Sequence, residues 1–331
     1  MATLKQIAAA AGVSVTQASR ALGGHHDVSR ATRDRVRAAA DQLGYHPNRA
    51  ARALVSGRSG LVAMVVPAPD APPAEDPLFE IVMGLSAEFT RRDLHFVLHV
   101  LQPGEDAAEA HERLWRGGGI DGFVVIQPKV SDPRIARLAD LGAAFVVHGA
   151  SAIAGSAPRV DIDNGAAAFD LVRAARESGH DHILFLNGPE DQVFAAERRK
   201  GALRAGLDAD AISHGPMLRR RGREEAATAL TTATPPTAII AGNTFLAEGV
   251  YAAAADLGLS IPMDLSVLAH DDALSAHDPA TFTPPLTGTR APLADAWAPI
   301  ADRLSGVSGS SAGSLHRLDM SWMTGGSLAQ R

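Results

Sequence analysis

Cysteine is absent from the 331-residue sequence. Its absence excludes disulfide bonds, thiol nucleophiles and zinc sites with cysteine ligands. No stretch approaches the roughly 18 consecutive apolar residues that a membrane-spanning helix requires, so we expect no such span. The sequence starts without a basic segment followed by an apolar one, so we expect no secretory signal and a cytoplasmic location.

Charge is unevenly distributed along a chain of otherwise globular composition. Hydrophobic residues make up 46% and charged residues 21%, and the length favours about two domains. The formal net charge of −6 argues against a nucleic-acid binder only if it is spread evenly. Residues 1–60 contain nine Lys or Arg and three Asp, a net +6, and the remainder carries −12. A basic head on an acidic body is expected when only one part meets phosphate.

Two capping boxes predict two short helices near the N-terminus. Thr3 is followed three residues later by Gln6, and Ser14 by Gln17. In such a box the hydroxyl accepts a hydrogen bond from the backbone, and the Gln side chain bonds back to the cap. Gly12, which can adopt a positive φ, lies in the turn between them. Two short helices joined by a glycine-containing turn predict a helix-turn-helix.

The second of these helices carries residue types suited to reading bases. In a helix-turn-helix the second helix normally lies in the major groove, and its first residues contact base edges. The residues in question are Val15, Thr16 and Gln17, with Arg20 one turn later. Arg suits guanine, Gln suits adenine, and methyl groups suit thymine. A third helix is expected between Ser29 and Gly44. The alternative is a small bundle with a solvated basic face.

The following segment predicts a short helix that needs a partner. Pro47 ends the preceding element, Asn48 can cap a helix, and Gly57 can end it. About eight residues are too few for a stable isolated helix in water. Leu54 is apolar among small and basic residues, which suits a wedge inserted between base steps in the minor groove.

These motifs resemble the lactose-repressor (LacI/GalR) family of bacterial transcription regulators. The matching sequence segments include Thr3-Leu4-Lys5-Gln6-Ile7-Ala8, Ala11-Gly12-Val13-Ser14-Val15, Leu43-Gly44-Tyr45 and Ala50-Ala51-Arg52-Ala53-Leu54. The resemblance implies that Leu54 is inserted into the operator by two paired hinge helices. The expected DNA contacts are Thr3, Ser14, Val15, Thr16, Gln17, Ser19, Arg20, Ser29, Asn48, Ala51 and Leu54.

The rest of the chain alternates between short apolar runs and amphipathic segments. The apolar runs lie at 61–66, 94–101, 122–126, 144–147, 183–186, 237–241 and 266–269. The amphipathic segments lie around 79–92, 105–116, 132–141, 164–178, 191–206, 222–233 and 244–258. This alternation predicts parallel sheets covered by helices, in two doubly wound lobes rather than one sheet. Ligands of such sheets bind at the carboxyl ends of the strands, which places a site between the lobes.

The family resemblance covers essentially the whole chain and implies a periplasmic-binding-protein-like body. It implies that the chain crosses between the lobes near 160–164, 286–290 and 315–320. The implied domains are a helix-turn-helix over 1–46, a hinge helix and linker over 47–59, and a body over 60–331. Lobe 1 would hold 60–160 and 289–318, and lobe 2 would hold 161–288 and 319–331.

The resemblance also implies an effector site. Its positions are Phe79, Gln127, His148, Arg198, Asn243 and Asp271. Arginine, amide and carboxylate groups around an aromatic ring suit a sugar, which needs paired donors and acceptors and an apolar plate. Without the resemblance, an Asp at a strand end more often caps the next helix.

We therefore expect a DNA-binding transcriptional regulator, most simply a repressor, whose operator affinity is controlled by a sugar. It would bind a pseudo-palindromic operator as a homodimer. We expect no cofactor, no metal and no catalysis, because no motif assembles a nucleophile with its base. The alternatives are a sugar-binding protein, for transport or in the cytoplasm, and a sugar-acting α/β enzyme.

Overall fold

The computed structural model describes residues 2–23, 27–45, 57–68, 77–275, 277–306 and 313–331. The chain divides into two compact units, Met1–Ser59 and Gly60–Arg331. None of the helices among the described residues is long and apolar enough to cross a membrane.

The described part of the first unit is a helical bundle of α1 (Leu4–Ala11), α2 (Val15–Leu22) and α3 (Arg30–Gln42). Both predicted capping boxes are present: the Thr3 and Ser14 side chains accept hydrogen bonds from the backbone of Gln6 and Gln17, whose side chains bond back. Gly12 ends α1 with a φ of +64°, the left-handed conformation that its turn requires. The core is formed by Ile7, Ala8, Ala11, Ala18, Ala21, Val28, Val36, Ala39 and Ala40. The predicted hinge helix after Pro47 lies outside the described residues.

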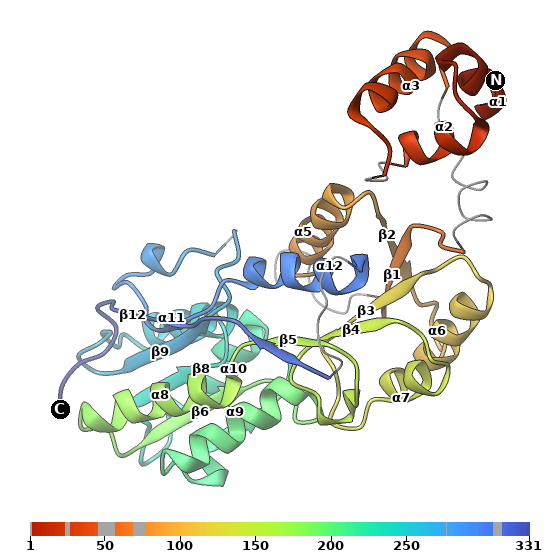
Figure 1. Ribbon diagram of the computed structural model, residues 1–331. Helices are drawn as coiled ribbons and strands as arrows, with labels where there is room; N and C mark the ends of the chain where they lie inside the picture. The colour runs from red at the N-terminus through yellow and green to blue at the C-terminus, as the bar shows by residue number, and fades with distance from the viewer. Residues whose placement is uncertain (1, 24–26, 46–56, 69–76, 276, 307–312) are drawn as a thin grey trace. The chain divides into compact units, whose positions relative to one another are not determined.

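The second unit contains two six-stranded sheets, each covered by helices on both faces (Figure 1). The first sheet has the order β11-β5-β4-β3-β1-β2, and all its neighbouring strands are parallel. Its strands are β1 (Leu61–Val66), β2 (His95–Val100), β3 (Gly122–Ile126), β4 (Phe145–His148), β5 (Arg159–Asp161) and β11 (Leu315–Arg317). Its helices are α5 (Leu78–Arg91), α6 (Ala107–Arg116), α7 (Pro133–Asp140) and α12 (Trp297–Ser305). We call this sheet and these helices the first lobe.

The second lobe repeats this plan with the strand order β12-β10-β9-β8-β6-β7. Only β12 is antiparallel to its neighbour. The strands are β6 (Ile183–Asn187), β7 (Ile212–His214), β8 (Ala238–Ala241), β9 (Ser266–Asp271), β10 (Thr287–Arg290) and β12 (Ser321–Met323). The helices are α8 (Asn164–Glu177), α9 (Val193–Arg204), α10 (Arg219–Leu230) and α11 (Thr244–Asp256). The predicted fold class, a helix-turn-helix head with two parallel-sheet lobes, is confirmed.

The sequence prediction missed the shortest elements. All seven predicted strands and all seven predicted helices are present, with ends within three residues. Strands of three residues, such as β5, β7 and β11, are too short to show a pattern. The chain crosses between the lobes after Asp161, after Arg290 and after Arg317. Asp161 therefore belongs to the first lobe and residues 289–290 to the second, a shift from the predicted boundaries.

Apolar side chains fill both faces of each sheet. In the first lobe, α5 and α12 cover one face through Leu85, Phe89 and Ile300, and α6 and α7 cover the other (Figure 1). In the second lobe, α10 and α11 cover one face, and α8 and α9 cover the other. The lobes are therefore separate α/β layers joined by the three crossings.

Helices α8 and α9 approach each other more closely than side chains would allow. A Cβ on Gly201 of α9 would lie 1.9 Å from the carbonyl oxygen of Gly165 on α8. No real Cβ tolerates that distance, so the contact requires glycine at position 201. The contact brings the polar side chains of both helices together at the lobe interface.

We predict that Gly201→Ala lowers the free energy of unfolding by about 1–3 kcal/mol, because the methyl group would force α9 away from α8. The measurement is urea unfolding followed by circular dichroism. Gly119→Ala is the control, since a Cβ there would meet nothing within 4 Å. Equal stability of both variants would contradict the close packing of these helices.

A buried histidine makes the stability of the first lobe sensitive to pH. His111 on α6 is fully buried, with its ring 5.1 Å from that of Phe123. Burial lowers the pKa of His111, and the hydrogen bond from its Nδ1 to the carbonyl oxygen of Ala107 opposes that change only in part. The folded chain thus resists a proton that the unfolded chain takes up near pH 6.5.

We predict that the melting temperature falls as the pH drops from 7 to 5.5, because the unfolded chain binds more protons in this range. His111→Leu should show a smaller fall, since one group with a lowered pKa is removed. Differential scanning calorimetry at both pH values tests this. A variant with the same fall as the wild type would show that His111 does not contribute.

Candidate functional site

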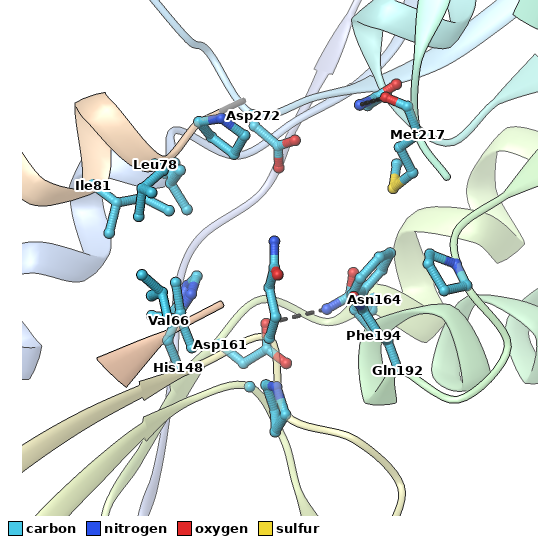
Figure 2. Close-up of a pocket in the computed structure, with 18 of the residues that line it drawn as sticks. Val66, Leu78, Ile81, His148, Asp161, Asn164, Gln192, Phe194, Met217 and Asp272 are labelled. Atoms are coloured by element: carbon cyan, nitrogen blue, oxygen red, sulfur yellow. Dashed lines mark hydrogen bonds between the residues drawn. The ribbon is translucent and has the colours of Figure 1, made fainter. Parts of the chain in front are cut away.

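A cavity of about 680 Å³ lies between the two lobes. It is lined at the carboxyl ends of strands from both sheets, by His148 and Asp161 in the first lobe and by Asn243 and Asp272 just beyond strands of the second. Figure 2 shows side chains from both lobes facing this space. This is the position at which open α/β sheets bind ligands.

The guanidinium of Arg198 is the central charge of the cavity. Arg198, on α9, is only 5% exposed. Its Nε donates to Oδ1 of Asn164 at 2.8 Å, and its Nη1 donates to the carbonyl oxygen of Gly242 at 2.7 Å. No described residue bonds to its Nη2. Burial lowers the pKa of Arg198, and the negative charges of Asp272 and Asp161 oppose this. Nη2 is therefore the donor left for a ligand.

Asp161 extends this network to the first lobe. Its Oδ1 accepts from Nδ2 of Asn164 at 3.1 Å and from the backbone of Ile162 at 2.8 Å, and its Oδ2 accepts from the backbone of Ala150 at 2.7 Å. Asp161 and Asn164 are 6% and 4% exposed. Burial raises the pKa of Asp161, an effect opposed by His148 and by these hydrogen bonds. The network spans the first crossing between the lobes.

Asp272 faces the cavity from the second lobe (Figure 2). The imidazole Nε2 of His270 lies 3.5 Å from Oδ1 of Asp272. Burial alone would raise the pKa of Asp272, but His270, Arg198 and His148 together hold it below its ordinary value. Burial lowers the pKa of His148. The cavity therefore places the guanidinium of Arg198 near the carboxyl group of Asp272 and the imidazole of His148.

The structure brings together four of the six predicted effector positions. Gln127, His148, Arg198 and Asn243 all line the cavity. Asn243 also begins α11, because its Oδ1 accepts from the backbone of Leu246 at 2.9 Å. Its Nδ2 donates to the carbonyl oxygen of Met217 at 3.2 Å, so its polar atoms are largely engaged.

Phe79 and Asp271 do not line the cavity, and their predicted placement is wrong. Phe79 is 74% exposed on the outer face of α5, while its neighbour Leu78 faces the cavity. Asp271 is fully buried, and its carboxylate accepts from Arg290 at 2.8 Å and from the backbone of Ala273 at 2.9 Å. In both cases the adjacent residue, Leu78 or Asp272, takes the position in the cavity.

The further lining residues that sequence reasoning missed include Asp161, Asn164, Phe194, Met217 and Asp272. Asp161 and Asn164 stand in the predicted crossing segment, and Asp272 follows a predicted strand. A polar residue in a crossing segment or at a strand end could have indicated that it lines the cavity. Phe194 lies in a predicted helix, four residues before Arg198, and its helical spacing was the only available signal.

Five of the predicted DNA contacts are exposed on α2 of the first unit. Val15, Thr16, Gln17, Ser19 and Arg20 are exposed on α2, while Ala18 is buried beneath them. The caps of the three helices are Thr3, Ser14 and Ser29. Asn48, Ala51 and Leu54 lie outside the described residues.

Arg20 is held by an ion pair within the head. Its Nη2 lies 2.6 Å from Oδ2 of Asp27, and its Nε donates to Oδ1 at 3.3 Å. Both side chains are nearly half exposed, so water screens the pair and its contribution to stability is small. The ion pair with Asp27 orients the guanidinium of Arg20, which stays exposed at the surface.

Known proteins share both parts of this architecture. Residues 3–48 match the family described as "Bacterial regulatory proteins, lacI family", and residues 172–327 match the "Periplasmic binding protein-like domain". The HTH-type transcriptional regulator AglR of Rhizobium meliloti is 39% identical over 311 residues, which cover 92% of this chain and 87% of that protein. CelR of Thermobifida fusca is 31% identical over 297 residues, with 86% and 85% covered.

Two solved structures have the same fold along the whole chain. The transcriptional regulator CelR in complex with cellobiose gives a TM-score of 0.69 at 27% identity, with 99% of this chain and 100% of that chain covered. The lac repressor dimer bound to operator and the anti-inducer ONPF gives a TM-score of 0.78 at 24% identity, with 99% of each covered.

The head, the two lobes and the extent of these similarities lead to one assignment. The family is composed of DNA-binding regulators, which excludes the enzyme and transport alternatives. The chain belongs to the lacI family of bacterial regulatory proteins and is a DNA-binding transcriptional regulator.

Proposed function

We propose that this regulator responds to a neutral oligosaccharide of about disaccharide size, bound in the cavity between its lobes. The observation that carries the proposal is the buried Arg198, which offers an unused Nη2 to a cavity of about 680 Å³. Pockets of this volume hold ligands larger than a single small metabolite. The relative solved with cellobiose, a disaccharide, supports the same ligand class.

The charges of the cavity favour a neutral ligand over an anionic one. Asp161 and Asp272 stand near Arg198, so a phosphate or carboxylate at this guanidinium would also meet two carboxyl groups. The other lining cations, Lys129 and Arg134, are each paired with an acidic residue, Asp191 and Asp132. Sugar hydroxyls both donate and accept, so they can bond to the guanidinium and to the carboxylates at once. We infer that Arg198, Asn243, Gln127 and His148 contact the sugar, together with Asp161 and Asp272.

The exposed surface of the first lobe supports pairing with a second copy. Phe79 and Met83 of α5 are 74% and 56% exposed, and Leu98 and Val100 of the edge strand β2 are 37% and 39% exposed. Helix α5 packs beside β2, so these side chains share one apolar face. Contiguous apolar faces of this kind mark protein interfaces. Such a homodimer would present two heads to a pseudo-palindromic operator.

We propose that the residues predicted from the sequence to contact DNA do so. Val15, Thr16, Gln17 and Arg20 would read base edges, and Asn48, Ala51 and Leu54 of the hinge would contact the minor groove. Contacts at Thr3, Ser14, Ser19 and Ser29 would position the head on phosphates. A regulator of this kind acts where the operator is, in the cytoplasm, and repression released by the sugar is the simplest response.

We predict that Arg198→Met abolishes the response to sugar while the protein still binds its operator. Removing the guanidinium removes the main ligand donor and leaves Oδ1 of Asn164 without its partner. The test is a gel shift with and without cellobiose, maltose or trehalose. Arg199→Met, at a neighbouring position outside the cavity lining, is the control.

The wild type must first show a response for this comparison to hold. A thermal-shift screen identifies the sugar, since a ligand at 100 times its Kd adds about 2.7 kcal/mol of stability. No stabilisation by any neutral disaccharide would overturn the proposed effector class. Loss of operator binding in Arg198→Met would show instead that this residue is structural.

We predict that Arg20→Ala weakens operator binding and leaves sugar binding unchanged. A lost bidentate contact to guanine costs about 1–3 kcal/mol, or roughly 5- to 150-fold in Kd. Fluorescence anisotropy with labelled operator measures the change, and Arg220→Ala on the exposed surface of α10 is the control. An unchanged operator affinity would exclude Arg20 from base recognition.

A further inference from the structure

Three aromatic side chains contribute to the described lining of the cavity, Phe194, Phe245 and His148. Phe245 is only 3% exposed, and its ring meets that of His277 at 4.3 Å, edge to face. His148 packs near Trp297, with ring centroids 6.2 Å apart. Phe194 is partly exposed within the cavity wall and faces the cavity in Figure 2. Phe194 is thus the phenyl ring with surface available to a ligand.

The ring of Phe194 is fixed by its neighbours. The guanidinium carbon of Arg198 lies over the ring, 5.1 Å from its centroid. A Cβ on Gly188 would lie 2.5 Å from the ring Cζ and 3.2 Å from the sulfur of Met217. Because Gly188 has no side chain, the ring of Phe194 can occupy the space that a Cβ would fill. We call this space the seat of the ring. A ring held in this way loses little freedom when a ligand stacks on it.

Hydrogen bonds fix the end of strand β6, next to Gly188. The side chain of Asn187 donates to the carbonyl oxygen of Ala195 at 2.8 Å and accepts from the backbone of Gly188 at 2.8 Å. These bonds tie the end of β6 to the first turn of α9, which carries Phe194. The positions of Gly188 and Phe194 are therefore set together.

We propose that Phe194 is the platform on which one pyranose ring of the oligosaccharide stacks, a role that rests on the proposed function. A pyranose ring has an apolar C–H face and a rim of hydroxyls. Phe194 supplies an apolar plate, while Nη2 of Arg198 supplies a donor immediately beside it. A ring seated on the plate can place a hydroxyl on that donor.

This arrangement determines specificity for rings over open chains. An acyclic polyol offers as many hydroxyls as a sugar but has no rigid apolar face to lay on Phe194. The polar groups of the cavity would accept either ligand, whereas the platform favours only the ring. Phe194 is therefore a specificity-determining residue for cyclic sugars.

The test uses the full-length protein and isothermal titration calorimetry. Cellobiose, maltose, trehalose, sucrose and melibiose are first titrated into the wild type, and the tightest binder is used afterwards. Phe194→Ala should raise its Kd about tenfold or more, and Phe194→Leu, which retains apolar volume, about three- to tenfold. Phe194→Tyr retains the ring and should stay within about threefold of the wild type.

Phe282→Leu is the matched control for loss of a phenyl ring. Phe282 packs edge to face on Tyr251 in the second lobe, with centroids 4.9 Å apart, and does not line the cavity. It should bind the sugar as the wild type does. Circular dichroism and melting temperature verify that each variant folds.

A second readout reports contact directly and does not depend on affinity. Phe194→Trp should add a tryptophan signal that changes when the sugar binds, beyond any change in the wild type. If the wild type binds the sugar and both Phe194→Ala and Phe194→Leu bind it with the wild-type Kd, the platform is overturned while the sugar effector stays in place. Failure of all five sugars to bind the wild type would overturn the proposed function and the platform together.

Discussion

The geometry of the cavity depends on the hydrogen bonds of the buried Arg198 guanidinium. A charge removed from water is tolerated only when nearby groups satisfy its hydrogen bonds. Asn164 and the carbonyl oxygen of Gly242 satisfy two of its nitrogens, and Asn164 in turn donates to Asp161. This chain of bonds joins α9 to α8 and then to β5 of the other lobe. One buried charge therefore sets the relative position of elements from both lobes.

Helix α9 supplies the parts of this arrangement at helical spacing. Phe194, Arg198 and Gly201 follow one another at intervals of four and three residues, so they lie along one side of the helix. The glycine permits the approach to α8 that brings Arg198 to Asn164, and the guanidinium carbon of Arg198 lies 5.1 Å from the centroid of the Phe194 ring. Each of the three has a local role, yet none would be placed correctly without the other two.

The predictions from sequence held where the determining interaction is local. The capping boxes at Thr3 and Ser14 involve residues three apart, and the alternation of strands and helices is visible in short windows. Helix α12 was missed although Trp297, Ile300 and Leu304 follow a helical spacing, because the segment lies beyond the regular alternation. The shortest strands carry too few residues for any pattern.

The two wrongly predicted cavity residues are each displaced by one position in the sequence. Leu78 and not Phe79 faces the cavity, and Asp272 and not Asp271. The rotation of α5 is fixed by the packing of Leu85 and Phe89 on the first sheet, and Asp271 is drawn inward by Arg290. Neither contact can be read from neighbouring residues, because the partners are distant in sequence or determined by tertiary packing.

The rotation of α5 also places the cavity lining and the exposed apolar side chains on different faces of one helix. Leu78 and Ile81 line the cavity, while Phe79 and Met83 lie on the outer apolar face. Between them, the carboxylate of Glu80 accepts hydrogen bonds from the backbone and the hydroxyl of Ser275, in the second lobe, at 3.0 and 3.1 Å. A rigid helix cannot shift one of these faces without shifting the others. Movement of the second lobe would therefore reach the outer face of α5 directly. Under the proposed function, coupling between the effector and the operator must act equally in both directions, and it would need no long pathway within the body.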